Sequence, residues 1–394
     1  MTTAYDVAIV GGGSVGSSIA FFLLSDPAFS GRVAVIERDP GYKRASSALS
    51  ASAIRQQFST RENVRMSRFG IGFLHDIDRH LGLEGGEPID LGLQEKGYLY
   101  LATPSFEPAM RENHQLQREE GADVVLLSPA QLGERFPWLS TEGIALASLG
   151  LKDEGWFDGY GLMQAFRRKA RAMGAEYLTA EAVGLDVERD RVTTVKLADG
   201  NDLEAGTVVN AAGPWARHVA AMAGVPLPVE ARRRCVFVFD ARWQQPDFPL
   251  VIDTSGAWFR PEGEGFITGH APPEAEDLPD LPLEVDRREF DEFLWPALAE
   301  RVPRFEAIKV THSWAGYYEV NTFDHNAILG PHPEIANLLF ANGFSGHGLM
   351  QSPAVGRGIS ELIVHGRYLT LDLSVFGYER IPEGRPVVEK NVIG

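Results

Sequence analysis

The chain opens on the stretch Tyr5-Asp-Val-Ala-Ile-Val10, which runs directly into Gly11-Gly-Gly13-Ser-Val-Gly16. An apolar helical pattern follows, and then a second strand pattern, Arg32-Val-Ala-Val-Ile-Glu37. A lone G-x-G-x-x-G turn is a weak signal. With a strand before it, a helix after it and a second strand that ends in an acid, it has the layout of a dinucleotide-binding βαβ unit.

The glycines of this segment meet specific physical needs. Gly11 permits the tight turn, Gly13 lets the backbone approach a pyrophosphate, and Gly16 lets helix and strand pack closely. The helix N-terminus then faces the phosphates with unpaired N–H groups and the positive end of its dipole. Glu37, about twenty residues past the last glycine, is placed to accept hydrogen bonds from a ribose, and an acid there disfavours a 2′-phosphate. The motif does not separate NAD from FAD.

Composition indicates an ordinary soluble globular protein. The 394 residues are 44% hydrophobic and 23% charged, which is enough chain for two domains with substantial cores. No apolar run approaches the roughly eighteen residues of a membrane-spanning helix. The first strand begins at about residue 5, which leaves no room for a signal or transit peptide, so we expect a cytoplasmic protein.

Charge and cysteine content exclude several classes of site. The net charge of −17 argues against nucleic acid as a partner, because phosphate binding needs clustered Lys and Arg. In the basic run Arg232-Arg-Arg234, at least one arginine must point to solvent, a domain interface or an anionic ligand, since a strand alternates its faces. The lone Cys235 precludes a disulfide within the chain, and we expect it to be buried like a small hydrophobe. Histidine spacing predicts no metal site.

Further along the chain, strand and helix patterns return in three blocks. We expect a strand over 97–102, a charged helix over 106–120, a helix that Asp158 caps, and a helix over about 353–365. A buried strand also meets Gly213 and a helix that starts with proline. Two insertions therefore split the dinucleotide-binding elements into three pieces.

This split order resembles the D-amino acid oxidase superfamily of FAD enzymes over nearly the whole chain. It is carried by the glycine-rich entry, Asn210-Ala-Ala-Gly-Pro-Trp215 in the middle and Gly343-Phe-Ser-Gly-His-Gly348 near the end. Two other segments, Ser46-Ser-Ala-Leu-Ser-Ala-Ser-Ala-Ile-Arg-Gln-Gln-Phe58 and Trp314-Ala-Gly-Tyr-Tyr-Glu-Val-Asn-Thr-Phe-Asp324, resemble the FAD-dependent oxidoreductase-domain family known from mitochondrial complex I assembly. More broadly, the chain is similar to sarcosine oxidase, dimethylglycine dehydrogenase and D-arginine dehydrogenase.

The resemblance implies an α/β fold with a Rossmann-like FAD-binding domain and an inserted, antiparallel-sheet α+β substrate domain. The expected FAD-binding domain is discontinuous and comprises residues 1–85, 150–224 and 325–385. Residues 86–149 and 225–324 form the substrate domain, and 386–394 a tail.

The resemblance also implies where FAD binds. The loop from Ser46 to Ser52 passes beside the isoalloxazine ring, and the Gly346-His-Gly348 turn brings a helix N-terminus to its N1 and C2 carbonyl, where negative charge develops on reduction. The residues expected to bind FAD are Gly11, Gly13, Ser14, Val15, Gly16, Glu37, Arg38, Ser46, Ser47, Ala48, Ser50, Val183, Ala212, Gly213, Trp215, Gly343, Ser345, Gly346, His347, Gly348, Leu349 and Met350.

Enzymes of this superfamily oxidise a C–N bond by hydride transfer to flavin N5, and the resulting imine hydrolyses. The substrates expected here are a D-amino acid, an N-methylglycine or an opine-like secondary amine. Arg55 matches the arginine that binds the substrate carboxylate in sarcosine oxidase, and the alternative is a structural arginine that pairs within its loop. The residues expected at the reaction centre are Arg55, Tyr318, His347 and Met350.

Departures from the relatives refine this expectation. Met350 replaces a carboxylate-binding lysine and Tyr318 an arginine, which thins the carboxylate clamp. Tyr317 replaces a flavin-tethering cysteine, and no histidine lies in the loop from Ser46 to Ser52, so FAD is expected to bind non-covalently. Ile267 replaces the lysine credited with oxygen activation, which favours a dehydrogenase or a slow oxidase.

Two residues of the substrate domain are also predicted. His270 is expected to be a loop or core histidine, and Arg260 is a residue that would favour an acidic substrate side chain.

Three functions stay open. One function is amino acid oxidation, with O2 or another redox carrier as acceptor. Another is a flavoprotein retained for assembly or scaffolding, with little or no catalysis. An NAD-dependent dehydrogenase is disfavoured, because the Gly-His-Gly segment and the split topology have no role in it.

Overall fold

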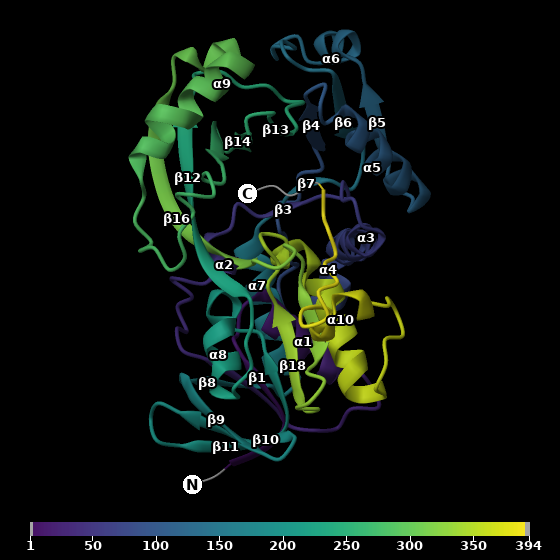
Figure 1. Cartoon of the computed structure of the whole chain (residues 1–394), viewed down its shortest axis with the longest axis vertical. Coiled ribbons are helices and arrows are strands. Elements are labelled where there is room, and N and C mark those ends of the chain that lie inside the picture. Colours follow the sequence, from purple (N-terminus) through teal and green to yellow (C-terminus); the bar gives the residue numbers. More distant parts are fainter. Residues whose placement is uncertain (1–2, 391–394) are drawn as a thin grey trace.

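Two large sheets organise the chain, and the computed structural model describes residues 3–390 of it. In Figure 1 the first sheet lies in the lower half of the molecule and the second in the upper half. Strands of the first sheet run in the order β17-β18-β11-β1-β2-β8, with the β9–β10 hairpin joined to β11. Its strands are β1 (Thr3–Val10), β2 (Val33–Glu37), β8 (Glu176–Thr179), β9 (Ala182–Glu188), β10 (Arg191–Leu197), β11 (Asp202–Asn210), β17 (Ile328–Pro331) and β18 (Leu338–Asn342).

The second sheet runs in the order β16-β12-β15-β14-β13-β4-β6-β5. Its strands are β4 (Tyr98–Ala102), β5 (Val124–Leu127), β6 (Leu146–Gly150), β12 (Val229–Asp240), β13 (Leu250–Ile252), β14 (Trp258–Glu262), β15 (Gly265–Gly269) and β16 (Lys309–Asn321). A small sheet pairs β3 (Ala53–Ile54) with β7 (Gly155–Trp156). All neighbours in the second sheet are antiparallel except β13 and β4, which join its two chain segments in parallel. The α/β fold class is confirmed, with that one parallel pair as an addition.

The helices are short and mostly amphipathic. They are α1 (Ser14–Ser25), α2 (Ser46–Leu49), α3 (Arg61–His75), α4 (Ile77–Leu81), α5 (Glu107–Glu119), α6 (Pro129–Arg135), α7 (Gly159–Ala172), α8 (Ala216–Met222), α9 (Trp295–Arg301) and α10 (Gly348–His365). Single turns are η1 (Gly213–Trp215), the π-helical η2 (Glu289–Leu294), η3 (Pro303–Glu306), η4 (Ser374–Phe376) and η5 (Tyr378–Arg380). Among the described residues, none of the helices is both long and apolar enough to cross a bilayer.

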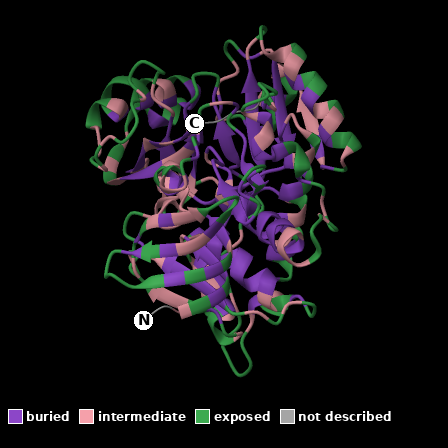
Figure 2. Ribbon diagram, turned by 60° about the horizontal axis from the view of Figure 1, so that its bottom comes forward, coloured by how far each residue is buried: buried purple, intermediate pink, exposed green. Residues whose placement is uncertain are grey.

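Strand periodicity divides the first sheet between two cores. Val7 and Ile9 of β1 pack in one cluster with α1, α3, α7 and α10, whereas Ala8 and Val10 pack in another with α8 and the β9–β10 hairpin. Successive side chains of a strand point to opposite faces, so a strand covered on both faces is apolar throughout. Figure 2 shows this buried interior in purple, with exposed residues gathered on loops and outer helix faces.

The chain alternates between the two large sheets. The first sheet takes strands from 3–37, 176–210 and 328–342, and the second from 98–150 and 229–321. This alternation agrees with a discontinuous dinucleotide-binding domain, whose boundaries remain our proposal. The last described residues are packed, because the buried Glu389 accepts hydrogen bonds from Ser59 N and Thr60 Oγ1 at 2.6 and 3.2 Å.

The last long helix begins five residues before the expected start. It runs from Gly348 to His365 and includes Pro353, which has no N–H for the Leu349 carbonyl. The Ser352 hydroxyl donates to that carbonyl at 2.9 Å and so replaces the missing bond. The helix therefore keeps its first turn despite the proline, and this turn borders the cavity described below.

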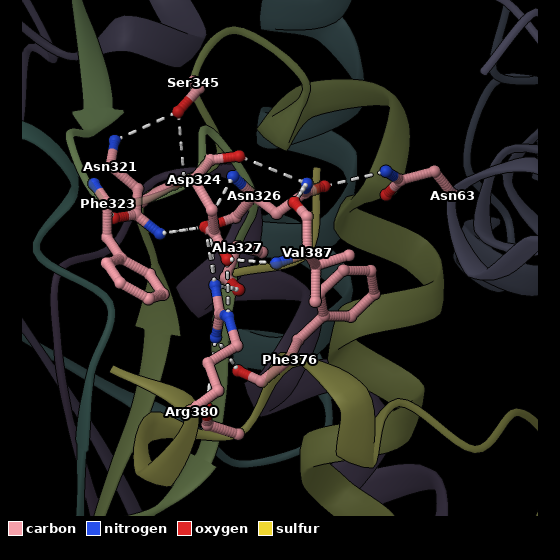
Figure 3. Close-up of polar contacts among 12 residues, drawn as sticks. Asn63, Asn321, Phe323, Asp324, Asn326, Ala327, Ser345, Phe376, Arg380 and Val387 are labelled. Carbon is pink, nitrogen blue, oxygen red and sulfur yellow. Dashed lines mark hydrogen bonds and ion pairs between the residues drawn. The ribbon is translucent and has the colours of Figure 1, made fainter. Parts of the chain in front are cut away.

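A buried ion pair fastens the C-terminal segment to the loop after β16 (Figure 3). Arg380 Nε and Nη2 donate to the two carboxylate oxygens of Asp324 at 2.8 and 3.0 Å, and both side chains are almost completely buried. The same carboxylate accepts Val387 N–H at 3.0 Å and Asn321 Nδ2–H at 2.8 Å. Asn321 N in turn donates to Ser345 Oγ at 3.0 Å, so the network reaches the turn before α10.

We expect Arg380→Met to lower the free energy of unfolding by about 3–5 kcal/mol, because it leaves the Asp324 charge buried without its partner. Urea denaturation of the apoprotein, followed by circular dichroism, measures the change. The matched control is Arg385→Met, which removes an exposed pair with Glu383 and should cost less than about 1 kcal/mol. Equal midpoints for the two variants would contradict the role assigned to Arg380.

Candidate functional site

A cavity of about 390 Å³ extends from the glycine turn after β1 to the underside of the second sheet. Many predicted site residues line it: Gly11, Gly13, Ser14, Val15, Glu37, Arg38, Ser46, Ser47, Ser50, Ala212, Gly213, Trp215, Tyr318, Gly346, Gly348 and Leu349. The residues from Gly11 to Ser50 and from Ala212 to Trp215 come from the segments that follow β1, β2 and β11. Tyr318 comes from β16, and the last three residues lie at the start of α10 or just before it.

The glycine turn is built on close backbone contacts. Gly11 has φ +108°, and a Cβ on it would lie 2.2 Å from the Ala211 carbonyl oxygen. A Cβ on Gly16 would lie 1.9 Å from the Gly11 carbonyl oxygen. Gly16 therefore lies beneath the cavity rather than in its wall, and it lets α1 approach β1 as expected.

The end of β2 supplies an acid and, further on, a phenol. Glu37 Oε2 accepts Gly12 N–H at 2.9 Å, and Oε1 accepts Asp39 N–H at 2.8 Å. The Tyr42 hydroxyl lies beside Glu37 in the cavity wall, is buried, and has no hydrogen-bond partner among the described residues. Burial raises the pKa of Tyr42, so its phenol stays protonated and able to donate.

Two serines lie over the N-terminus of α1, where a pyrophosphate is expected. Ser47 Oγ accepts Ser14 N–H at 3.1 Å and donates to Ser14 Oγ at 3.0 Å. Ser46 Oγ donates to the Tyr317 carbonyl at 2.6 Å, which ties this loop to β16. The first turn of α1 thus offers N–H groups and hydroxyls in one place, which suits an anion.

At the opposite wall, two arginines flank an indole. The guanidinium carbons of Arg38 and Arg44 lie 4.1 and 5.4 Å from the Trp215 ring centre. Val183 does not line the cavity, and its side chain is 52% exposed. Its neighbour Ala182 takes the inward position of β9, because side chains alternate along a strand. Ala48 lines a second cavity instead of this one, and FAD contacts of Val183 and Ala48 stay predictions.

The turn before α10 has an unusual backbone. Gly343, Ser345 and Gly346 all have positive φ, at 75°, 51° and 98°. A Cβ on Gly346 would lie 2.5 Å from the Tyr318 ring, so only glycine allows this close approach. The turn sends the N–H groups at the start of α10 toward the cavity, while Gly343 and Ser345 support it from outside the lining.

Arg55 and Met350 lie outside the cavity lining, and so does His347, although it belongs to this turn. Arg55 Nη2 donates to His347 Nε2 at 2.8 Å, Nη1 donates to the Tyr100 hydroxyl, and the guanidinium lies 4.1 Å from the Phe58 ring centre. Burial and then Arg55 hold the pKa of His347 well below its usual value, so this histidine is neutral and its Nε2 accepts. Met350 packs in the core of the first sheet.

The far end of the cavity lies under the second sheet. Arg234, Cys235, Trp258 and His270 line it together with Tyr318. Arg234 lies 5.3 Å from the Tyr318 ring centre and donates to both carboxylate oxygens of Asp277 at 2.7 and 3.0 Å.

The basic run and the cysteine of the sequence are thereby explained. Arg232 pairs with Glu230, Arg233 with Glu289, and Arg234 faces the cavity. Cys235 is buried as predicted, and burial raises the pKa of its thiol to about 12. His270 is buried, as expected of a core histidine, but it lines the cavity and its Nε2 has no hydrogen-bond partner in the described chain.

A second cavity of about 690 Å³ shares Ser50 and Ala51 with the first. Ile267 and Arg260 line it, with Trp156 and Trp314. Arg260 pairs with Glu262 and donates to the Ala51 carbonyl at 2.7 Å, so it also holds the loop between the cavities.

A group of possible metal ligands includes no lining residue of either cavity. Ligand atoms of His75, Glu95 and Asp153 lie within 4.8 Å of one another, and histidine spacing did not indicate this group because its members come from three segments. His75 and Glu95 are exposed and already hydrogen-bond each other at 3.2 Å. We assign no ion to it.

These features fit an FAD molecule. The cavity offers a glycine cradle at a helix N-terminus, an acid for a ribose, an unpartnered phenol beside that acid, and a second turn with N–H groups at its other end. Together with the Rossmann-like sheet and the covering second sheet, they define a flavin-dependent oxidoreductase. The family model for FAD dependent oxidoreductase, DAO, matches residues 6–362, and the chain belongs to this family. The predicted family and cofactor are confirmed.

Similar proteins extend along nearly the whole chain. FAD-dependent oxidoreductase domain-containing protein 1 of Xenopus laevis is 46% identical, over 98% of this chain and 85% of its own. Glycine oxidase of Geobacillus kaustophilus is 29% identical, over 96% of this chain and 98% of its own. The crystal structure of L-proline dehydrogenase from P. horikoshii matches with a TM-score of 0.85 at 26% identity, over 98% of this chain and all of that chain.

Sequence reasoning missed several residues of the cavity wall. They are Tyr42, Arg44, Ala182, His218, Trp258 and Glu319, whereas Arg234 belongs to the basic run for which an anionic ligand was one expected partner. Most come from the second sheet or from turns without a motif, and their position depends on how two distant segments pack. Glu319 was quoted in a resemblance segment but gave no signal of its own.

We expect Glu37→Gln to weaken FAD binding roughly tenfold, because it replaces a charged acceptor with an amide that offers one acceptor oxygen. Quenching of flavin fluorescence on titrating apoprotein into FAD gives the dissociation constant. Glu188→Gln, an exposed change at the end of β9, serves as control and should leave the constant unaltered. An unchanged constant for Glu37→Gln would show that this acid does not contact the ribose.

Proposed function

We propose that this protein oxidises the C–N bond of a small amino acid or N-substituted amino acid, such as a D-amino acid, an N-methylglycine or an opine-like secondary amine. One observation carries the proposal. The FAD cavity continues past Ser46 and Ser50 to a polar and aromatic end formed by Arg234, Trp258 and Tyr318. A protein that bound FAD without catalysing a reaction would not need this polar and aromatic end of the cavity.

When bound, FAD supplies the oxidant that takes two electrons from the C–N unit as the imine forms. The chain binds and orients the amine and keeps water from the reacting bond. Arg234 and the Tyr318 hydroxyl are the donors that we propose for a substrate carboxylate. A guanidinium held in place by Asp277 is a fixed cation, which suits a carboxylate.

Arg55 takes a different part in this proposal. It is buried and engaged with His347, Tyr100 and the Gln57 carbonyl, so we propose it as a positioning residue. Through His347 it fixes the turn that brings the α10 N-terminus to the cavity. Because His347 is neutral, the pair adds a single positive charge behind this turn.

The test is the visible absorption of the FAD-loaded protein under anaerobic conditions while D-amino acids, N-methylated glycines and opines are added. One class should bleach the flavin, and Tyr318→Phe should raise the concentration needed about tenfold by removing one hydrogen bond. Tyr5→Phe, outside the cavity, is the control. A flavin that no compound bleaches would contradict the proposal and favour an assembly or scaffolding flavoprotein.

We further propose that an acceptor other than O2 reoxidises the enzyme, because the apolar Ile267 stands where sarcosine oxidase has a lysine, in the second cavity, which shares Ser50 and Ala51 with the FAD cavity. Ile267→Lys should raise the rate at which O2 reoxidises the reduced protein at least tenfold, since a cation stabilises charge that develops on oxygen. Stopped-flow mixing with aerated buffer measures this rate. Ile267→Met, of similar size and uncharged, should change it little, and equal rates in both variants would refute the argument.

A further inference from the structure

Glu319 places a carboxyl group in the wall of the FAD cavity, and the proposed reaction has no use for it. Its Oε2 accepts Gly343 N–H at 3.0 Å, and its main-chain carbonyl accepts Ser345 N–H at 3.0 Å. Both contacts are with the turn that precedes α10. The carboxyl group is therefore fixed where the cavity and this turn meet, and Gly343 N–H engages only its Oε2.

Among the described residues, none of the cations pairs with the Glu319 carboxyl group, although arginines line the same cavity. The ionisable groups of its own strand, of β12 and of α8 that flank it or share its cavity are Tyr317, Tyr318, Glu230, Arg232, Arg234, Cys235 and His218, and Arg234 is paired with Asp277. Arg232 is paired with Glu230, at 2.5 Å. Burial raises the pKa of Glu319 to about 8, and Gly343 N–H is the contact that opposes this rise. At neutral pH the group is therefore mostly a neutral acid.

A neutral carboxylic acid has one O–H donor, which a carboxylate lacks. Since Gly343 N–H occupies one oxygen of Glu319, the O–H can reside on the other. The diphosphate, the ribityl chain and the flavin carbonyls of FAD all offer acceptor oxygens. An ionised carboxylate in the same cavity would instead repel the diphosphate.

We propose that Glu319 binds FAD as a protonated acid and donates a hydrogen bond to an acceptor oxygen of the cofactor. This inference depends on FAD as cofactor and is independent of the proposed reaction. It makes FAD binding sensitive to mildly alkaline pH, because only the protonated form can donate.

The direction in which the FAD dissociation constant changes with pH follows from the linkage between proton binding and FAD binding. FAD binds the protonated form better, so it raises the pKa of Glu319 further in the complex. Between the two pKa values, FAD binding draws in a proton, and the dissociation constant rises with pH by up to about tenfold per pH unit. Below about pH 7 the constant should be flat, since Glu319 is then protonated with or without FAD.

The experiment measures FAD dissociation constants by fluorescence quenching between about pH 6.5 and 9.5. The wild-type constant should rise above pH 8, whereas Glu319→Gln, whose amide always donates, should follow only the pH dependence that free FAD imposes on both proteins. Glu264→Gln, an exposed change in the β14–β15 turn, should behave like the wild type. A wild-type slope equal to that of Glu319→Gln would overturn the proposal.

A second measurement needs no variant. Calorimetric titration of wild-type apoprotein with FAD, in buffers of different ionisation enthalpy, counts the protons taken up on binding. We expect uptake that approaches one proton per FAD near about pH 8.5 and almost none near pH 6.5. Absence of uptake, or release, near pH 8.5 would refute the role of Glu319. Neither outcome depends on whether any amine bleaches the flavin.

Discussion

Three backbone segments meet at Gly11 with no room for a side chain, and the rest of the site depends on this contact. Strand β1 lies beside β11 in parallel register, with Val10 opposite Asn210, so the turns that follow both strands end at the same edge of the sheet. The chain leaves β1 toward β2 on one side, while β11 and β18 lie on the other. Such a switch point opens a crevice at the carboxyl ends of the strands, and ligands of open α/β sheets bind there.

The second sheet completes the crevice by holding one loop from three directions. Ser46 Oγ donates to the Tyr317 carbonyl on β16, Trp314 Nε1 donates to the Leu49 carbonyl at 2.9 Å, and Arg260 donates to the Ala51 carbonyl. These contacts join residues that are more than 200 positions apart, as the sequence separations of 271, 265 and 209 show. Residues 46–51 therefore have a defined position only when the two large sheets are packed together. The buried pair of Asp324 and Arg380 separately fastens the C-terminal segment to the loop that follows β16 (Figure 3).

Local patterns predicted the parts of the fold that local physics determines. The glycine turn, the apolar strands around it and the Asp158 cap, whose carboxylate accepts Gly161 N–H at 2.8 Å, were all readable from short stretches. The pattern of β9 did not show that Ala182 rather than Val183 lines the cavity, because strand alternation cannot be phased without knowing which face is inward. Arg55 carried two readings because its sequence position gives no information about Tyr100 and His347, which reach it from other elements. Tyr42 and Glu319 had no detectable signal, since burial of a single polar group depends on the complete packing.

Charge explains how an acidic chain can accommodate an anionic cofactor. With a net charge of −17, the protein as a whole does not attract a diphosphate over long distances. Arginines do line the cavity, but Arg38 is paired with Glu181 at 3.0 Å and Arg234 with Asp277. The remaining attraction comes from Arg44 and from short-range groups, namely helix N-termini, hydroxyls and, as we propose, a neutral Glu319. Hydrogen bonds of this kind depend on geometry to within a few tenths of an ångström, so the close backbone contacts at Gly11 and Gly346 govern recognition as well as folding.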